Sequence, residues 1–359
     1  MLSFKKTTTF QFKCQIPNYI DLYLKKENIY SRFLKFYRRY IYIKLKRQKN
    51  LELFSILPKH KKILWINISA PSLGDSLMDL SSRVLLRNKK IDLFTDKKNA
   101  HIFKDDSFFT NVFIDEEKVK INNYDLVILD SYSSRSIRIK SRIAYQTNYV
   151  GMFGFFNGPE VNRILFSFHQ MNNLLGYLKS QSEINSIARN TISISKSDEK
   201  IIKTIVPKKY ITIAIGGEWK YKTYEKWASL IEQIFTANAN TNIVLIGSKN
   251  GCNESKKLSE KFSDFQLLDL VSRLSFNQTA EVIRCSDFLI CCDGGLMHAA
   301  NAVSTKVIAL LARLTPEMLF TSEDSISLFD KKDVNYIKVE DIFLKYAELT
   351  ISDDNHLLS

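Results

Sequence analysis

The sequence lacks the long apolar segments that would direct a chain into or across a membrane. No apolar run among its 359 residues reaches the roughly 18 to 20 residues of a membrane-spanning helix. The N-terminus also lacks the apolar stretch of about 7 to 15 residues that marks a signal peptide. Apolar residues make up 45% and charged residues 25% of the chain, which excludes a wholly disordered or collagen-like protein. We therefore expect a cytoplasmic globular protein, long enough for two domains of roughly 150 residues each.

Cysteine pairs with the CxxC spacing are also absent. The five cysteines are Cys14, Cys252, Cys285, Cys291 and Cys292, an odd number. Reduced, buried thiols are therefore expected, rather than a disulfide framework or a metal site.

Acidic residues are scarce in one part of the chain only. Residues 1–62 hold 16 lysines and arginines against three acids, whereas the remaining residues hold 36 against 35. The net charge of +14 therefore lies almost entirely in a basic N-terminal extension. Such a segment suits an anionic membrane surface, an acidic acceptor or a nucleic acid.

Apolar residues in this extension recur at helical spacing and predict an amphipathic helix. The stripe comprises Ile29, Phe33, Phe36, Tyr37, Tyr40 and Ile41. A basic, aromatic-rich helix suits the surface of an anionic leaflet, so we expect peripheral attachment to the inner face of the cytoplasmic membrane. The alternative is a helix docked on the body of the protein. Nucleic acid is the weakest option, because the aromatic residues are not interleaved with the basic ones as in a stacking platform.

Strands that alternate with helices predict two parallel-sheet α/β domains after the extension. The expected parts are the extension 1–62, an N-terminal domain 63–180, a polar linker 181–208, a second domain 209–320 and a mixed tail 321–359. Packing of the tail back on the N-terminal domain is one expectation. Ligands of open α/β sheets bind beyond the carboxyl ends of the strands. Two Rossmann-like domains facing a cleft would thus hold a nucleotide in one half and an acceptor in the other.

The segment Asp293-Gly294-Gly295-Leu296-Met297-His298 follows a predicted buried strand and opens a helix. Its glycines let backbone amides approach a ligand closely, and a helix N-terminus attracts anions such as a diphosphate. His298, in the first helical turn, is placed to donate to a phosphate or a sugar hydroxyl. The structural alternative makes Asp293 a helix cap and packs His298 beneath the helix.

The turn 69–75 occupies the equivalent strand-to-helix position of the first half. Asp75 would lie at a helix N-terminus, where its carboxylate can take a proton from an acceptor hydroxyl as a general base. The alternative is an ordinary N-cap, for which aspartate is also favoured. The turn has no G-x-G-x-x-G pattern, which argues against a nicotinamide-dependent dehydrogenase.

A third loop, 216–222, leaves the carboxyl end of the first strand in the second half. It opens with Gly216 and Gly217 and carries Lys220 and Lys222. A lysine here can stabilise the negative charge that grows on a departing diphosphate. The alternative is a solvated surface lysine.

Together the three loops resemble glycosyltransferase family 9, the heptosyltransferases of lipopolysaccharide core synthesis. The family's turn ending in Gly-Asp is matched by Gly74 and Asp75, and its lysine seven residues before an aromatic residue by Lys220 and Trp227. Its signature, Asp-Thr-Gly-Leu-x-His-x-Ala, is matched over residues 293–300. The resemblance covers roughly residues 62–320.

Two departures from the family pattern concern the donor loops. Gly294 replaces the usual threonine of the signature, which removes a hydroxyl group. Tyr221, Lys222 and Thr223 replace the residues that normally follow the lysine, so either Lys220 or Lys222 is the functional amine.

The resemblance implies an inverting glycosyltransferase of the GT-B fold. The donor would be ADP-heptose and the acceptor a lipid-linked lipopolysaccharide core or related bacterial glycan, with no metal or other cofactor. Asp75 would be the general base, and Lys220 with the amides of residues 294–297 would stabilise the departing ADP. The implied donor-binding residues are Gly216, Gly217, Lys222, Glu254, Asp293, Gly294, Gly295, Leu296, Met297 and His298. The implied acceptor-binding residues are Ser69, Ser72 and Gly74.

A second hypothesis is a catalytically silent relative that binds a nucleotide-sugar or glycan and acts as a partner subunit. The departures around Lys220 motivate it. Release of ADP from ADP-heptose in the presence of an acceptor distinguishes the two.

Overall fold

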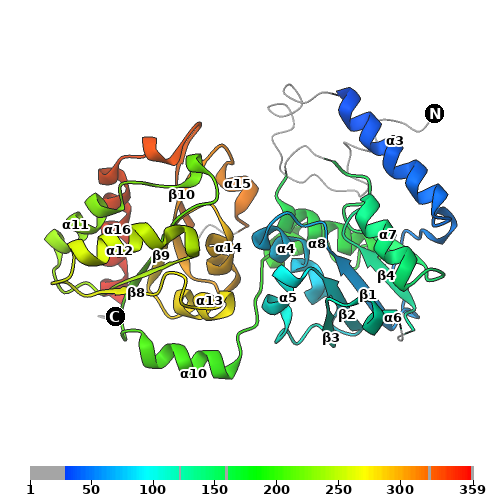
Figure 1. Cartoon of the computed structure of the whole chain (residues 1–359), viewed down its shortest axis with the longest axis horizontal. Helices are drawn as coiled ribbons and strands as arrows, with labels where there is room; N and C mark the ends of the chain where they lie inside the picture. Colours follow the sequence, from blue (N-terminus) through cyan, green and yellow to red (C-terminus); the bar gives the residue numbers. More distant parts are fainter. Residues whose placement is uncertain (1–28, 121–122, 158–160, 322–324, 357–359) are drawn as a thin grey trace. The chain divides into compact units, whose positions relative to one another are not determined.

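The computed structural model describes residues 29–120, 123–157, 161–321 and 325–356. These divide into two compact units, with the boundary between Ser193 and Ile194 (Figure 1). Cys14 and residues 1–28 of the basic extension lie outside the described residues. No helix in the described part of the chain is long and apolar enough to cross a membrane.

The first unit is built on a five-stranded parallel sheet. Its strands are β1 (Lys62–Asn67), β2 (Lys90–Thr95), β3 (Asn111–Phe113), β4 (Leu126–Leu129) and β5 (Tyr149–Gly151), in the order β3-β2-β1-β4-β5. In β1, Trp65 and its neighbours are fully buried, as expected of a strand covered on both faces. The helices are α3 (Ile29–Leu45), α4 (Leu73–Asp79), α5 (Lys97–Phe103), α6 (Glu116–Lys120), α7 (Ser134–Ile143), α8 (Arg163–Leu174) and α9 (Gln181–Ile187). The short 3₁₀ segments are η1 (Lys49–Leu51) and η2 (Ser81–Leu86).

The second unit holds a six-stranded parallel sheet. Its strands are β6 (Ile211–Ile215), β7 (Ile243–Gly247), β8 (Leu267–Asp269), β9 (Phe288–Cys292), β10 (Lys306–Ala312) and β11 (Ser325–Asp330), in the order β11-β10-β9-β6-β7-β8. Read from β8, this is the 3-2-1-4-5-6 order of Rossmann domains. The helices are α10 (Lys196–Ile205), α11 (Trp227–Ala237), α12 (Cys252–Lys261), α13 (Phe276–Arg284), α14 (Gly295–Ala302), α15 (Pro316–Leu319) and α16 (Val339–His356). Three 3₁₀ turns are η3 (Lys220–Lys222), η4 (Lys249–Gly251) and η5 (Val334–Tyr336).

The expected fold class is confirmed, since both sheets are parallel and both carry helices. The polar segment 181–208, expected as a linker, contains α9 and α10. The tail contributes to the second unit: β11 pairs with β10, and Ile342 and Tyr346 of α16 belong to the core beneath α11.

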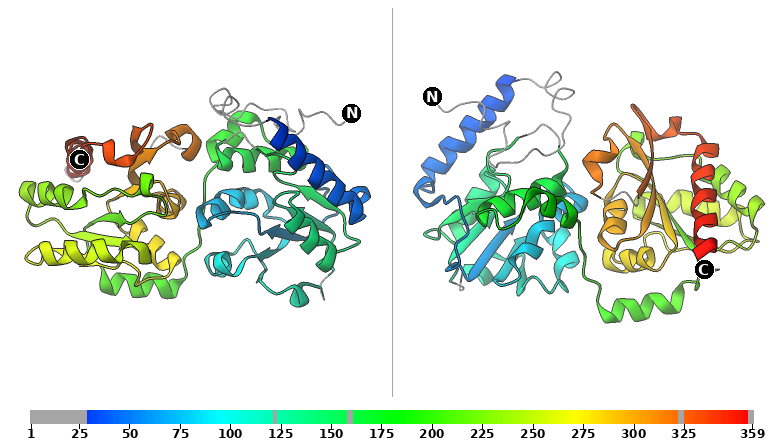
Figure 2. Two further views of the ribbon diagram at one scale, coloured as in Figure 1. Left: turned by 45° about the horizontal axis from the view of Figure 1, so that its top comes forward. Right: turned by 180° about the vertical axis from the view of Figure 1, so that it is seen from behind.

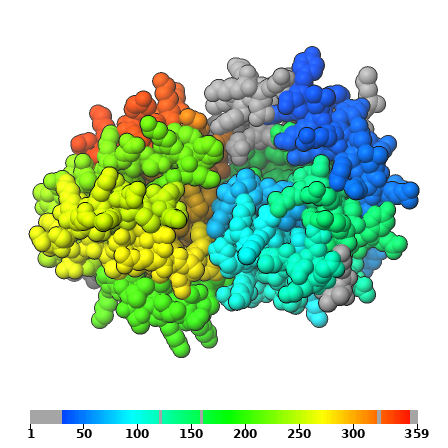
Figure 3. Space-filling view, in the orientation of Figure 1, coloured from blue at the N-terminus to red at the C-terminus, as the bar shows by residue number. Residues whose placement is uncertain are grey.

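The apolar stripe of the N-terminal helix divides between two faces of α3. Phe36 is buried against Phe155, with ring centroids 4.8 Å apart, and Ile43 is fully buried in the same core. Phe33, Tyr37 and Ile41, by contrast, are exposed. The side chain of Ile29 lies outside the described residues. One face of α3 therefore docks on the first unit beside α7, and Figures 2 and 3 show the helix at the surface of that unit. Another apolar face of α3 remains exposed.

A buried lysine lies under this docked segment. The Lys140 side chain is fully buried in α7, where its amine donates to Gln48 and to the Tyr145 carbonyl, 3.1 Å away. Burial lowers the pKa of Lys140 to about 7. The unfolded chain therefore binds more protons than the folded chain between about pH 7 and the ordinary lysine pKa of about 10.4.

From this difference we predict that the free energy of unfolding rises with pH above about 7. The contribution of Lys140 has a slope of up to about 1.4 kcal/mol per pH unit. Lys140→Met, which keeps the apolar stem, should remove this slope. Urea unfolding of both proteins at several pH values measures it, and parallel pH profiles of the two would contradict the assignment.

Candidate active site

The first unit changes its direction of strand order between β1 and β4. Strands β2 and β3 lie on one side of β1, and strands β4 and β5 lie on its other side. Ligands of open α/β sheets bind at such a switch point, outside the carboxyl ends of the strands. The loops that leave β1 and β4 therefore frame the candidate site of this unit. The first loop carries Ser69 and Ser72, and the first turn of α4, which follows it, carries Gly74 and Asp75.

Asp75 occupies the third position of α4 rather than its cap. Ser72 is the N-cap, and the two residues form a capping box, in which each side chain accepts from the backbone of the other. The Ser72 hydroxyl also donates to Asp75 Oδ2 at 2.6 Å. The alternative that Asp75 is the N-cap is thus wrong, because the N-cap is Ser72. Asp75 nevertheless stabilises the start of the helix through the capping box. Its side chain stays one-fifth exposed.

The second carboxylate oxygen of Asp75 faces an arginine. Asp75 Oδ1 lies 3.5 Å from Arg163, which holds Asp79 through three hydrogen bonds of 2.7–2.9 Å. Burial raises the pKa of Asp79 to about 7, against the opposing effect of the arginine. Two carboxylates one helical turn apart thus share one guanidinium group, which fixes the orientation of Asp75.

A buried aspartate at the end of β4 organises the neighbouring loop. Asp130 accepts hydrogen bonds from the amides of Ile68 and Ser69 and from the Ser136 hydroxyl, at 2.6–2.8 Å. Burial raises the pKa of Asp130, and these donors counteract the increase. The Ser69 hydroxyl lies 2.9 Å from that of Ser133, so it belongs to a serine cluster at the sheet edge.

The second unit has its switch point between β6 and β9. The loop after β6 begins with Gly216, whose φ of +92° favours glycine. A Cβ on Gly217 would lie 2.3 Å from the Thr223 hydroxyl and 2.8 Å from the Lys222 carbonyl. A Cβ on Gly216 would lie 2.8 Å from Asn250 Oδ1. Neither position leaves room for a side chain, so the loop folds closely against its own continuation and against the loop after β7.

An ion pair joins the two loops of this switch point. The Lys222 amine contacts the Asp293 carboxylate, and both side chains are largely buried. Lys220, on the same 3₁₀ turn, is exposed. The predicted residues of the two loops are therefore brought together, with Lys222 rather than Lys220 as the contact to Asp293.

The N-terminus of α14 is open to a ligand on geometric grounds. Its N-cap is Gly294, without a capping side chain, so the expectation of Asp293 as a helix cap is wrong. A Cβ on Gly294 would meet no atom within 4 Å. The amides of Gly295 and Leu296 belong to the first turn, where a helix offers no internal acceptor. Met297 and His298 are buried beneath the turn.

Two further residues, Glu254 and Arg313, lie just beyond the carboxyl ends of strands in this sheet. Glu254 lies in the first turn of α12, just beyond the carboxyl end of β7. Arg313 directly follows β10, has a left-handed φ of 69°, and stacks 3.7 Å above the Tyr221 ring. Sequence reasoning missed Arg313, and likewise Asp79, Asp130 and Arg163 in the first unit. In the described residues no group of three or more histidine, cysteine or acidic side chains is placed to hold a metal ion.

Comparisons with known proteins identify the family and find solved structures with a similar fold. Residues 156–338 match the profile of glycosyltransferase family 9 (heptosyltransferase). A family 9 glycosyltransferase from Veillonella parvula is 12% identical with a TM-score of 0.68, over 83% of this chain and 99% of its own. ADP-heptose lps heptosyltransferase II from E. coli is 16% identical with a TM-score of 0.65, over 82% and 99%. E. coli heptosyltransferase WaaC with ADP is 16% identical with a TM-score of 0.62, over 80% and 99%. No curated protein sequence matches the chain.

Proposed function

This chain belongs to glycosyltransferase family 9, the heptosyltransferases, and from that premise we propose that it transfers a heptose from ADP-heptose to a lipopolysaccharide core or related bacterial glycan. The family match is the observation that carries the proposal. Its GT-B fold, shared with the E. coli heptosyltransferases, supplies a switch point in each unit.

In the proposed reaction the acceptor hydroxyl oxygen attacks the anomeric carbon of the heptose. The bond from that carbon to the diphosphate oxygen breaks, and ADP leaves from the opposite face, so the configuration inverts. Asp75 takes the hydroxyl proton. The capping box and Arg163 hold its carboxylate in one orientation, which general base catalysis requires.

The charge that develops on ADP is stabilised in the second unit. The first amides of α14 and the positive end of its dipole face the diphosphate. Lys222 is neutralised by Asp293, whereas Lys220 is exposed, so Lys220 is the amine we assign to the diphosphate. Lys222 then has a positioning role, because its ion pair connects the β6 loop to the start of α14. Glu254 is assigned to the ribose.

Equilibrium binding of nucleotides tests the donor assignment. Isothermal titration calorimetry of the whole chain with ADP, UDP and GDP should show ADP as the tightest ligand. Tighter binding of UDP or GDP would exclude an ADP-sugar donor while leaving the family assignment intact.

We further propose that the protein works at the inner face of the cytoplasmic membrane, attached through the exposed face of α3. That face carries Leu34, Ile41 and Leu45, which are 67%, 48% and 74% exposed. Exposed basic residues flank it, among them Lys35, Arg38 and Lys44. Apolar insertion together with cationic attraction to anionic lipid is the usual means of such attachment.

Point substitutions test this attachment without disturbing the docked face. Leu34→Ser/Ile41→Ser should weaken co-sedimentation with phosphatidylglycerol vesicles by at least about tenfold, because two apolar side chains no longer leave water. The matched control is Leu344→Ser/Ile351→Ser, which changes an equally exposed pair on α16 of the other unit. Wild-type binding should also weaken with salt. Equal binding of both double variants would refute the assignment of α3.

A further inference from the structure

A groove lies in the first unit at the edge of the sheet opposite to Asp75. It has a volume of about 750 Å³, within the usual range of small-molecule sites. Lys61 and Lys89, which line it, immediately precede β1 and β2, whereas Asp75 follows the carboxyl end of β1. Neither the loops of the candidate active site nor α3 contributes to it, so the proposed reaction gives it no role.

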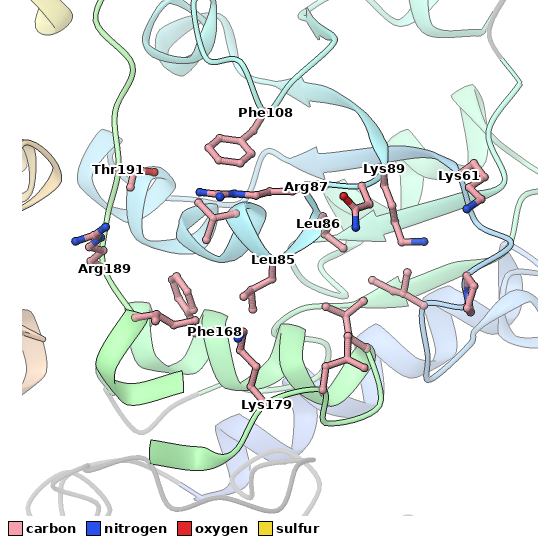
Figure 4. Close-up of a pocket in the computed structure, with 17 residues that line it drawn as sticks. Lys61, Leu85, Leu86, Arg87, Lys89, Phe108, Phe168, Lys179, Arg189 and Thr191 are labelled. Atoms are coloured by element: carbon pink, nitrogen blue, oxygen red, sulfur yellow. The ribbon is translucent and has the colours of Figure 1, made fainter. Parts of the chain in front are cut away.

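The floor of the groove is apolar. Leu85 of η2, which is partly buried, and Phe168 of α8, which is fully buried, both line it, and Phe108 closes the side above them (Figure 4). Leu85 and Ile187 are only partly buried, at the outer side of the cluster around Phe168. These side chains would lose further contact with water if an alkyl chain lay along the floor, which is favourable by about 25 cal/mol per Å².

The rim of the groove is positively charged. Its basic residues are Lys61, Arg87, Lys89, Lys179 and Arg189, and the described residues that line it include no aspartate or glutamate. One of these cations, Lys89, is held by the backbone of the segment before β1. Lys89 donates to the carbonyls of Leu57 and His60, at 3.1 and 2.7 Å. Burial, followed by the charge of Lys61, lowers the pKa of Lys89.

One end of the groove has the composition of a phosphate site. The Arg87 guanidinium lies 5.6 Å from the Phe108 ring centroid and points toward Arg189 and Thr191 (Figure 4). The buried Thr191 hydroxyl has no hydrogen-bond partner among the described residues. Two guanidinium groups and a hydroxyl can thus converge on an anion at this end.

We propose that this groove binds a phospholipid through one acyl chain on the apolar floor and its phosphate between Arg87, Arg189 and Thr191. An apolar floor with a purely cationic rim favours a ligand that has both an alkyl chain and a negative charge. A neutral glycan lacks the alkyl chain and the charge, and a free nucleotide lacks the chain. The inference does not depend on the transferase activity, because binding is measured without donor or acceptor.

Dodecyl phosphate, below its micelle-forming concentration, is the probe. Calorimetry of the full chain should show saturable binding with a negative heat-capacity change, the signature of apolar burial. Inorganic phosphate and dodecyl maltoside, which supply the charge or the chain alone, should each bind at least about tenfold more weakly. If either binds as tightly as dodecyl phosphate, the two-part recognition is wrong.

Charge reversal locates the site. Arg87→Glu/Arg189→Glu should weaken dodecyl phosphate binding by about 30-fold or more, because each cation beside an anionic headgroup contributes about fivefold. The matched control is Lys256→Glu/Lys257→Glu, the same charge change at two exposed positions of α12, which should bind as the wild type does. Leu85→Trp, which fills the floor, should also abolish binding of dodecyl phosphate.

Three results would overturn the proposal. The first is unchanged binding by Arg87→Glu/Arg189→Glu, and the second is an equal loss in the control. The third is a wild-type dimer in light scattering that Arg87→Glu/Arg189→Glu converts to a monomer, since the groove would then be an interface between copies. Thermal unfolding of each variant separates a local effect from loss of the fold.

Discussion

Asp75→Asn should lower kcat by about 10²- to 10⁴-fold, the usual contribution of a general base. Asparagine has the same shape, and its amide oxygen can still accept from the Ser72 amide, which lies 3.0 Å from Asp75 Oδ2. The variant should therefore bind ADP with unchanged affinity and melt close to the wild type. Steady-state rates of ADP release, combined with calorimetric ADP binding, measure both quantities.

Ser72→Ala provides the control for this experiment. It removes the N-cap and the hydroxyl donor to Asp75 but keeps the carboxylate. We expect a loss of about 0.5–2 kcal/mol in the free energy of unfolding and a smaller loss of kcat than in Asp75→Asn. If Asp75→Asn turns over at the wild-type rate, Asp75 serves only the capping box and the base is another group.

Lys220→Ala should slow transfer by about 10²- to 10³-fold, as expected when one preorganised donor to a developing charge is removed. It should also weaken ADP binding, because the amine contacts the diphosphate before and after the reaction. Lys220 is exposed, so the variant should fold normally. Single-turnover rates and ADP affinities measure the two effects.

Lys222→Ala is the informative partner of this variant. It leaves the Asp293 carboxylate largely buried without its cation, so it should destabilise the second unit. We expect a smaller effect on the rate of transfer than in Lys220→Ala. If Lys222→Ala slows transfer more than Lys220→Ala does, the roles of the two lysines are the reverse of those assigned. Lys222 would then leave Asp293 to bind the diphosphate.

The fold was predictable from the sequence because its signals are local. Short buried runs such as 63–68 and 124–130 alternate with helical patterns, and parallel sheets require that alternation. The glycine-containing turns at the switch points were recognisable for the same reason. Even the capping box has a local pattern, a serine at position 72 three residues before an acid.

The remaining features of the site depend on contacts between distant residues. Arg163 lies 84 residues beyond Asp79 in the sequence, and Arg313 lies more than 90 beyond Tyr221. No spacing rule identifies such pairs. The prediction of a single apolar face on α3 was wrong for another reason. Periodicity places residues on a helix surface, but it does not distinguish the face that docks from an adjacent face that stays exposed. Phe36 and Ile43, seven residues apart, docked, whereas Phe33, Tyr37 and Ile41 did not.

The most direct test of the proposed function is the release of ADP from ADP-heptose by the purified protein, with and without a lipopolysaccharide core acceptor. We predict rapid release only when the acceptor is present, together with a product heavier by one heptose in mass spectrometry. The Asp75→Asn protein should bind the donor but release little ADP. If the wild type binds ADP-heptose and yet releases no ADP with any core acceptor, the chain is a binding protein on a glycosyltransferase fold, and the proposed catalytic function is wrong.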